Sequence, residues 1–297
     1  MIERTLIISP QAGLANRLRA INSALILAEI SERRLLHCWH PIRPGHGQAH
    51  VNLIQQCGFE EFFLANEHIS AASKGGTVDE VISEWGPGDY WFQQQSSGQQ
   101  YFNKYATSRS TNVAARILHS GATSILLETT LRTWPTDHQG IDIRLPSGHA
   151  KYAAIDAYKK LSPRPEYLEL LQKVPQSTIG IHLRVGDLLK YCPEARQNLD
   201  EVAAWIHRLS SPNQNIAIFA DDSRVLGSLG LTPDMAAFNN EVHRHLDNLL
   251  PAQKAFASLL YLAHKCHVIY GTPGSSFSQE ASLFGAKKYG MILDDAL

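Results

Sequence analysis

Three polar side chains, His182, Arg184 and Asp187, follow a short apolar run that begins at Ile179. An apolar run of this length between turn residues predicts a buried parallel strand, and open α/β sheets bind ligands at the carboxyl ends of such strands. The arginine indicates the chemistry, because its planar guanidinium stays charged and binds phosphate or carboxylate through paired hydrogen bonds. We therefore predict a site for a phosphate-bearing ligand at this strand end.

Two acidic side chains follow the next predicted strand of the C-terminal half, residues 215–220. Adjacent residues of a strand face opposite ways, so Asp221 and Asp222 cannot have the same role. One of them is suited to hold a ribose or base, as acidic groups do in nucleotide-binding α/β folds. The alternative is that Asp222 or Ser223 caps the following helix, and caps of this kind are common.

A third strand, predicted at residues 266–270, leads into a turn rich in glycine and serine, GTPGSSFS at residues 271–278. The turn opens a helix, so its free N–H groups and serine hydroxyls can donate to a phosphate. Taken alone, it is more simply an ordinary turn with a serine cap. Three such strand ends in one half of the sequence favour a nucleotide site there.

The elements that position these residues form an α/β pattern. Residues 5–9 and 35–39 predict strands on either side of a helix whose apolar stripe runs from Leu14 to Ala28. Asn16 and Arg17 fall on the loop and first helical turn, where amide groups and the helix dipole favour an anion. Predictions for other segments are a strand at 124–128 and helices at 152–161, 199–209 and 251–265.

Length and composition bound the function classes. A chain of 297 residues suggests two domains, and the proline-rich segment 162–165 is the best linker, so we predict domains 1–160 and 161–297. The 27 Lys and Arg nearly cancel the 28 Asp and Glu, which argues against a nucleic-acid partner. Four scattered cysteines, no signal segment and no long apolar run predict a cytoplasmic protein with reduced thiols and without a transmembrane segment.

Four motifs in order resemble those of the GDP-fucose-dependent fucosyltransferase superfamily, which includes the α1,6-, nodulation-type and protein O-fucosyltransferases. They are GLANRLR at 13–19, HLRVGD at 182–187, FADD at 219–222 and GSSFS at 274–278. The resemblance implies a GT-B-like α/β fold, in which two Rossmann-like domains face a cleft. It also implies an inverting, metal-independent glycosyltransferase, with GDP-fucose held mainly by the C-terminal domain and the acceptor by the N-terminal domain.

The same resemblance implies roles for individual residues. Arg184 would bind the donor β-phosphate and neutralise charge as the sugar–phosphate bond breaks, which makes it catalytic. His182 would contact the nucleotide and Asp222 the base or ribose, while Asn16 and Arg17 would reach the donor from the first domain. The turn would supply the remaining donor contacts, Ser275, Ser276, Phe277 and Ser278.

The resemblance is incomplete at two positions. The glutamate that follows the arginine motif in α1,6 enzymes aligns with Cys192, so the catalytic base is open between Asp187 and Glu194. An SN1-like transfer needs only a weak base, and Asp187 is alternatively structural. The acidic residue that relatives direct at guanine aligns with Ser258, which leaves the base of the donor open as well.

Other functions remain alternatives. One is a transferase that uses another nucleotide sugar, and another is a nonenzymatic nucleotide- or glycan-binding protein on the same scaffold. The histidines are not joined to carboxylates or cysteines at ligand spacing, so no metal cofactor is expected, although Asp221 and Asp222 are adjacent. The acceptor is a glycan, a peptide hydroxyl or a small molecule, and the aromatic segment 90–105 is either a sugar platform or, more commonly, core.

Overall fold

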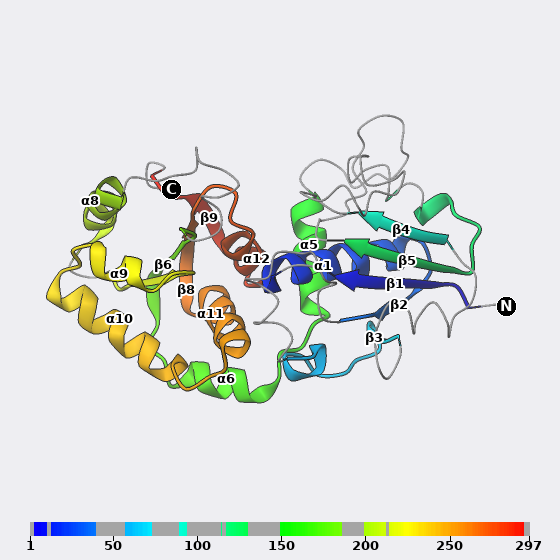
Figure 1. Cartoon of the computed structure of the whole chain (residues 1–297), viewed down its shortest axis with the longest axis horizontal. Helices are drawn as coiled ribbons and strands as arrows, with labels where there is room; N and C mark the ends of the chain where they lie inside the picture. The colour runs from blue at the N-terminus through cyan, green and yellow to red at the C-terminus, as the bar shows by residue number, and fades with distance from the viewer. Residues whose placement is uncertain are drawn as a thin grey trace. The chain divides into compact units, whose positions relative to one another are not determined.

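The computed structural model describes residues 3–10, 13–39, 57–72, 89–93, 114, 117–129, 149–185, 199–211 and 214–293. The chain divides into two compact units, Met1–Arg164 and Pro165–Leu297, each built on its own parallel sheet (Figure 1). The division falls inside the proline-rich segment 162–165, where Pro165 begins the first helix of the second unit. The predicted α/β fold class, with two parallel sheets, is confirmed.

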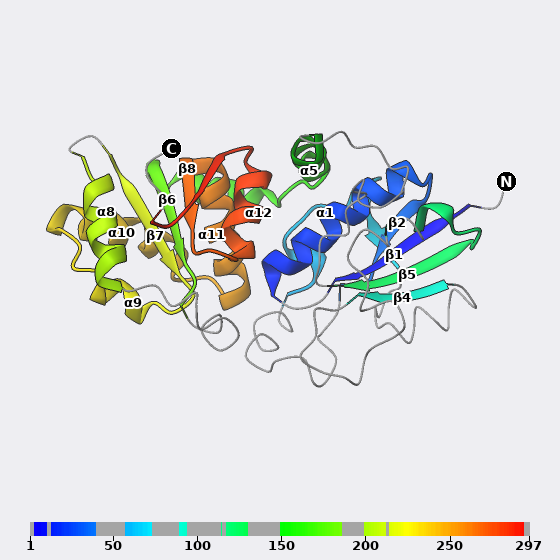
Figure 2. The same ribbon diagram turned by 90° about the horizontal axis from the view of Figure 1, so that it is seen from above.

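The first unit carries a sheet in which the described strands have the order β3-β2-β1-β5-β4. Every residue of the central strand β1 is buried, as expected for a parallel strand covered on both faces. Helix α1 connects β1 to β2 and packs against both strands (Figure 2). The elements are β1 (Thr5–Pro10), α1 (Leu14–Ile30), β2 (Arg34–His37), η1 (Phe59–Glu61), β3 (Ser70–Ala71), β4 (Asp89–Gln93), β5 (Ser124–Thr129) and α5 (His149–Lys159).

The second unit carries a sheet in which the described strands have the order β7-β6-β8-β9. Helix α8 lies on one side of this sheet, and α11 and α12 lie on the other (Figure 2). The elements are α6 (Pro165–Gln172), β6 (Ser177–Leu183), α8 (Leu199–Leu209), β7 (Ile216–Ala220), α9 (Arg224–Ser228), α10 (Pro233–Leu246), α11 (Pro251–Lys265), β8 (Cys266–Gly271), α12 (Ser276–Phe284) and β9 (Lys288–Met291).

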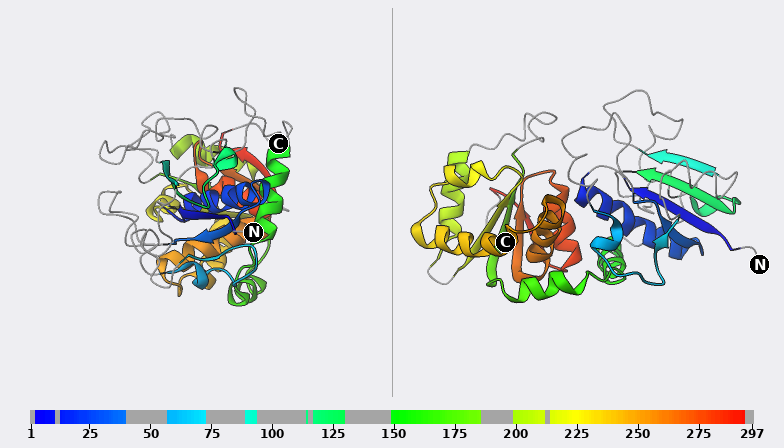
Figure 3. Two further views of the ribbon diagram at one scale, coloured as in Figure 1. Left: turned by 90° about the vertical axis from the view of Figure 1, so that its right-hand side faces the viewer. Right: turned by 60° about the horizontal axis from the view of Figure 1, so that its bottom comes forward.

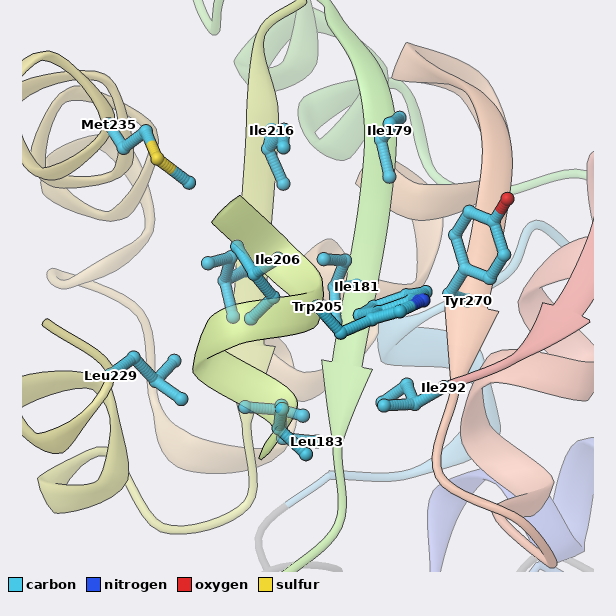
Figure 4. Close-up of a cluster of buried hydrophobic side chains, with 12 residues drawn as sticks. Ile179, Ile181, Leu183, Trp205, Ile206, Ile216, Leu229, Met235, Tyr270 and Ile292 are labelled. Carbon is cyan, nitrogen blue, oxygen red and sulfur yellow. The ribbon is translucent and has the colours of Figure 1, made fainter. Parts of the chain in front are cut away.

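Strand β6 separates two cores by the alternation of its side chains. The odd-numbered residues Ile179, Ile181 and Leu183 enter one cluster together with Trp205 and Ile206 of α8 (Figure 4). The even-numbered residues face the other helices. A Cβ atom at Gly180 would lie 2.6 Å from Leu262 of α11 and from Cys266, so glycine permits the close approach of that helix.

Side chains of helix α10 form hydrogen bonds with the backbone at the outer edge of β7. The amide of Ile218 donates to Asn239 Oδ1 (2.7 Å), and Asn239 Nδ2 donates to the carbonyl of Ile216 (3.0 Å). His243 Nε2 lies 2.8 Å from the carbonyl of Ile218. An edge strand otherwise exposes unpaired N–H and C=O groups, so these side chains take the place of a further strand.

Helix α6 attaches the start of the second unit to α11 (Figure 3). The rings of Tyr167 and Phe256 meet edge to face, with centroids 5.0 Å apart. Both rings are buried, so this aromatic contact adds to the area that the two helices bury. Within the described ranges, no helix combines the length and the apolarity that a membrane span requires.

Candidate functional site

The strand order of the second sheet reverses between β6 and β8. Strands β6 and β8 are neighbours, yet β6 continues outward to β7 on one side and β8 continues to β9 on the other. Loops that leave two adjacent strands in opposite directions separate at the carboxyl ends, and α/β sheets bind ligands in the crevice that results. The predicted residue His182 lies in strand β6 just before its end at Leu183, Arg184 directly follows the strand, and the turn before α12 follows β8.

His182 lies at the centre of this strand end and is only 6% exposed. Its ring stacks on Phe277 with centroids 4.3 Å apart and an interplanar angle of 19°. Nδ1 lies 3.3 Å from the hydroxyl oxygen of Ser275, its side-chain hydrogen-bond partner among the described residues. Burial, and after it the positive charge of Arg184, lowers the pKa of His182 to about 3. The imidazole is therefore neutral near pH 7.

The turn between β8 and α12 depends on two glycines. Gly274 has a φ of 76°, a left-handed conformation that glycine adopts without strain. A Cβ atom at Gly271 would lie 1.8 Å from the hydroxyl oxygen of Ser278, so glycine lets the first turn of α12 pack on the end of β8. The amide of Ser275 closes the turn by donating to the carbonyl of Thr272 at 2.9 Å.

The predicted serines Ser275 and Ser278 form hydrogen bonds within the turn and with His182. Ser275 precedes α12, but its hydroxyl bonds to His182 and does not cap the helix. The hydroxyl of Ser278 donates to the carbonyl of Ser275 at 3.4 Å, and both serines are fully buried. Ser276 is also buried. The first amides of an α-helix have no acceptor within the helix, so those of Ser276, Phe277 and Ser278 are suited to bind an anion.

Arg184 is half-buried and lies directly after β6. Its positive charge is the second cause, after burial, of the lowered pKa of His182. Its backbone amide donates to the hydroxyl oxygen of Thr272 at 2.9 Å. A cation, a neutral imidazole and the start of a helix therefore lie at one sheet edge, an arrangement suited to binding an anion such as a diphosphate.

Asp221 and Asp222 have different partners, as their adjacent positions predict. Asp222 forms a paired contact with Arg224, at 2.9 Å to Nε and 2.6 Å to Nη2, and its Oδ1 accepts the amide of Arg224 at 3.1 Å. These hydrogen bonds lower the pKa of Asp222 to about 2. Asp222 thus accepts the first amide of helix α9 from the position before the N-cap residue Ser223, whose own side chain makes no capping hydrogen bond. Asp221 accepts the amide of Val185 at 2.8 Å.

The candidates of the first unit lie at the start of α1. Asn16 is partly exposed in the first helical turn. Arg17 is fully buried, with its guanidinium carbon 5.1 Å from the centroid of the Trp39 ring. Burial lowers the pKa of Arg17 to about 9, so the side chain is still a cation near pH 7. Such a cation over an aromatic face is a stabilising contact.

The structure thus brings together His182, Arg184 and the turn of Ser275, Ser276, Phe277 and Ser278, and it places Asp222 at the end of the neighbouring strand β7. The two candidate bases, Asp187 and Glu194, lie outside the described residues. In the described part of the chain, no group of three or more His, Cys, Asp or Glu residues is arranged to hold a metal ion.

Sequence analysis missed two residues that build this site, Asp221 as a partner of Val185 and Thr272 as a partner of Arg184. Their position was a usable signal, because each directly follows a strand that neighbours β6.

Comparison with known proteins identifies the fold. No protein-family model matches the sequence, and no curated protein matches it. The fucosyltransferase NodZ from Bradyrhizobium is 17% identical with a TM-score of 0.55, over 96% of this chain and 94% of that one. POFUT1 in complex with GDP-fucose is 10% identical with a TM-score of 0.54, over 99% and 98%. A mutant of Arabidopsis thaliana FUT1 in complex with GDP is 11% identical with a TM-score of 0.56, over 99% and 71%. The chain therefore has the GT-B-like fold of these fucosyltransferases.

Proposed function

We propose that this protein is an inverting, metal-independent glycosyltransferase that transfers fucose from GDP-fucose to a hydroxyl acceptor. The observation that carries the proposal is the grouping of His182, Arg184 and the first turn of α12 at the point where the strand order of the second sheet reverses. The fold shared with NodZ and with POFUT1 in complex with GDP-fucose supports the choice of donor.

In this proposal the second unit binds the donor. The pyrophosphate lies against Arg184 and the free amides at the start of α12, with Ser275 and Ser278 holding the turn in shape. The stacked rings of His182 and Phe277 contact the nucleotide. Asp222 contacts the base or ribose through the carboxylate lone pairs that its hydrogen bonds with Arg224 do not use.

The chemical step depends on stabilising the departing GDP. The bond between the fucose anomeric carbon and the β-phosphate oxygen breaks, negative charge grows on the phosphate, and the sugar becomes oxocarbenium-like. Arg184 neutralises that charge, because its guanidinium is a preorganised cation at the strand end. The acceptor hydroxyl attacks the anomeric carbon from the opposite face, which inverts the configuration, and its proton passes to Asp187, Glu194 or water.

In this proposal the first unit binds the acceptor. Its partly exposed Asn16 is a donor contact, and the fully buried Arg17 supports the same helical turn through its contact with Trp39. The acceptor is a glycan, a peptide or a small molecule that presents a hydroxyl group. The polar and charged start of α1, where Arg17 packs on Trp39, is the part of this unit that we assign to the donor.

The proposal is tested by Arg184→Ala, assayed for GDP release and fucose transfer to a panel of glycan and peptide acceptors. Loss of a preorganised donor to a developing anion lowers kcat by about 10²–10³-fold, and we expect a loss of that size here. Arg208→Ala removes an exposed arginine of α8 and is the matched control. Normal turnover by Arg184→Ala would contradict the central assignment.

Donor choice and metal independence are tested on the wild-type protein. GDP is expected to raise the melting temperature more than UDP or dTDP, because a ligand that binds only the folded state stabilises it by mass action. A preference for UDP or dTDP would indicate another nucleotide sugar, and GDP binding without transfer would indicate a nonenzymatic protein. Transfer is expected to continue in EDTA. Complete loss that Mn²⁺ restores would count against a metal-independent reaction.

A further inference from the structure

Strand β6 leaves its sheet just before Arg184, so the next backbone amides need hydrogen-bond partners outside the regular strand pairing. The strand is paired with β7 up to Leu183 and with β8 up to His182. The amides of Arg184 and Val185 come after the last paired residue of the strand. Backbone groups without partners let a strand end fray, and fraying here would move the guanidinium of Arg184.

The strand on one side supplies a partner through Thr272. The amide of Arg184 donates to the threonine hydroxyl oxygen at 2.9 Å. In return, the amide of Thr272 donates to the carbonyl of His182 at 3.2 Å. Thr272 is 1% exposed, so water does not compete freely for this pair of hydrogen bonds.

The strand on the other side supplies the same kind of partner through Asp221. The amide of Val185 donates to the carboxylate Oδ1 at 2.8 Å. The amide of Asp221 donates to the carbonyl of Leu183 at 3.2 Å. Each neighbouring strand therefore ends in a residue that receives one amide of the departing chain through its side chain and returns a backbone hydrogen bond.

We propose that Thr272 and Asp221, here called the strand-end clasp, are positioning residues that fix Arg184 for phosphate binding. The inference rests on the proposed function for its catalytic consequence, but the hydrogen bonds that define the clasp do not. Because the clasp holds the backbone on both sides of the Arg184 Cα atom, it sets the point from which the guanidinium extends. Displacement of a catalytic group by about 1 Å can cost about 10²-fold in rate.

Hydrogen exchange tests the clasp without any assumption about activity. Thr272→Val keeps the shape of the side chain and removes the acceptor, so the Arg184 amide is expected to exchange at least about tenfold faster in the ligand-free protein. Thr272→Ser retains the hydroxyl and is expected to restore slow exchange. Thr178→Val, at the opposite end of β6, is the matched control and is expected to leave Arg184 unchanged.

Kinetics test the catalytic consequence. Thr272→Val is expected to lower kcat by about 10–10²-fold with a smaller change in KM, and Thr272→Ser to recover most of the loss. The effect should disappear in an Arg184→Ala background, because a residue that acts through Arg184 has nothing left to position. Asp221→Ala is a second variant that opens the other side, should Thr272→Val fail to fold.

The outcomes separate the two proposals. If the wild-type protein neither binds GDP nor transfers fucose, the proposed function is wrong, while the exchange measurements still decide whether the clasp exists. If Thr272→Val keeps both slow exchange at Arg184 and a wild-type kcat, the clasp is wrong. Equal losses with and without Arg184 would also overturn it, because Thr272 would then act independently of the arginine.

Discussion

His182 is a buried base held in its neutral form, and this has a cost as the pH falls. Its pKa in the folded protein is about 3, against 6.5 for an ordinary histidine, mainly because burial disfavours the charged ring. The unfolded chain therefore takes up a proton first. Between about pH 6.5 and about pH 3 the free energy of unfolding decreases as the pH falls, and above that window this contribution is constant.

A substitution isolates this contribution. His182→Gln removes the titrating group, so its free energy of unfolding should fall less steeply below pH 6 than that of the wild-type protein. One proton of difference corresponds to about 1.4 kcal/mol per pH unit, which is the limit for the difference between the two slopes. Urea unfolding at several pH values between 4.5 and 7 measures it. His245→Gln, on α10, is the control, and equal slopes for wild type and His182→Gln would refute the assignment.

Residue type predicts some of this site and misses the rest for a physical reason. Arginine and histidine side chains at a strand end are typical of ligand-binding sites, so the sequence predicts Arg184 and His182 as candidate site residues. Thr272 and Asp221 act by accepting backbone amides, and many threonines and aspartates do so without any relation to a ligand. Only the neighbouring positions of three strand ends, which the structure supplies, distinguish these two residues.

Among the elements, helices with a continuous apolar pattern were predictable and mixed ones were not. The predicted bounds of α8 and α11 agree with the structure, because α8 is strongly amphipathic and the second half of α11 is buried almost throughout. Helix α10 was not predicted, because Asn239, whose side chain bonds to β7, interrupts its apolar face. Helix α6 was not predicted, and its first residue, Pro165, was taken as the end of the linker, although proline at the first helical position is a helix-start signal.

The contact between α12 and β8 can be tested through its glycine. Gly271→Ala would place a Cβ atom 1.8 Å from the Ser278 hydroxyl oxygen, so the first turn of α12 must shift. Overpacking of this kind costs about 1–3 kcal/mol, and we expect both a lower melting temperature and weaker GDP binding. Gly227→Ala is the matched control, because no atom lies within 4 Å of its Cβ position in α9. A Gly271→Ala protein with wild-type stability and GDP affinity would show that the close approach is unimportant.

At the scale of the whole molecule, both units are built on a parallel sheet, but the two described sheets differ in strand order. In the second unit the order reverses once, between β6 and β8, whereas in the first unit the chain runs outward from β1 to β3 and later returns inward from β4 to β5 beside β1. Alternating strands and helices in the sequence predict parallel sheets, because parallel strands need a crossover between them. The order of the strands within a sheet follows from contacts between distant segments, so the position of the reversal emerged only from the structure.

This architecture predicts where GDP changes the protein. If the donor binds at the reversal point of the second unit, GDP should slow hydrogen exchange in peptides that cover the end of β6 and the start of α12. At a concentration about 100 times its Kd, it should stabilise the folded state by about 2.7 kcal/mol. Peptides from α10, which lies along the outer edge of β7, serve as the internal control, and UDP serves as the control ligand. Protection by GDP confined to the first unit, or equal protection by UDP, would require a different location or a different nucleotide. Loss of the protection in Arg184→Ala, with exchange in α10 unchanged, would identify the strand end itself as the contact.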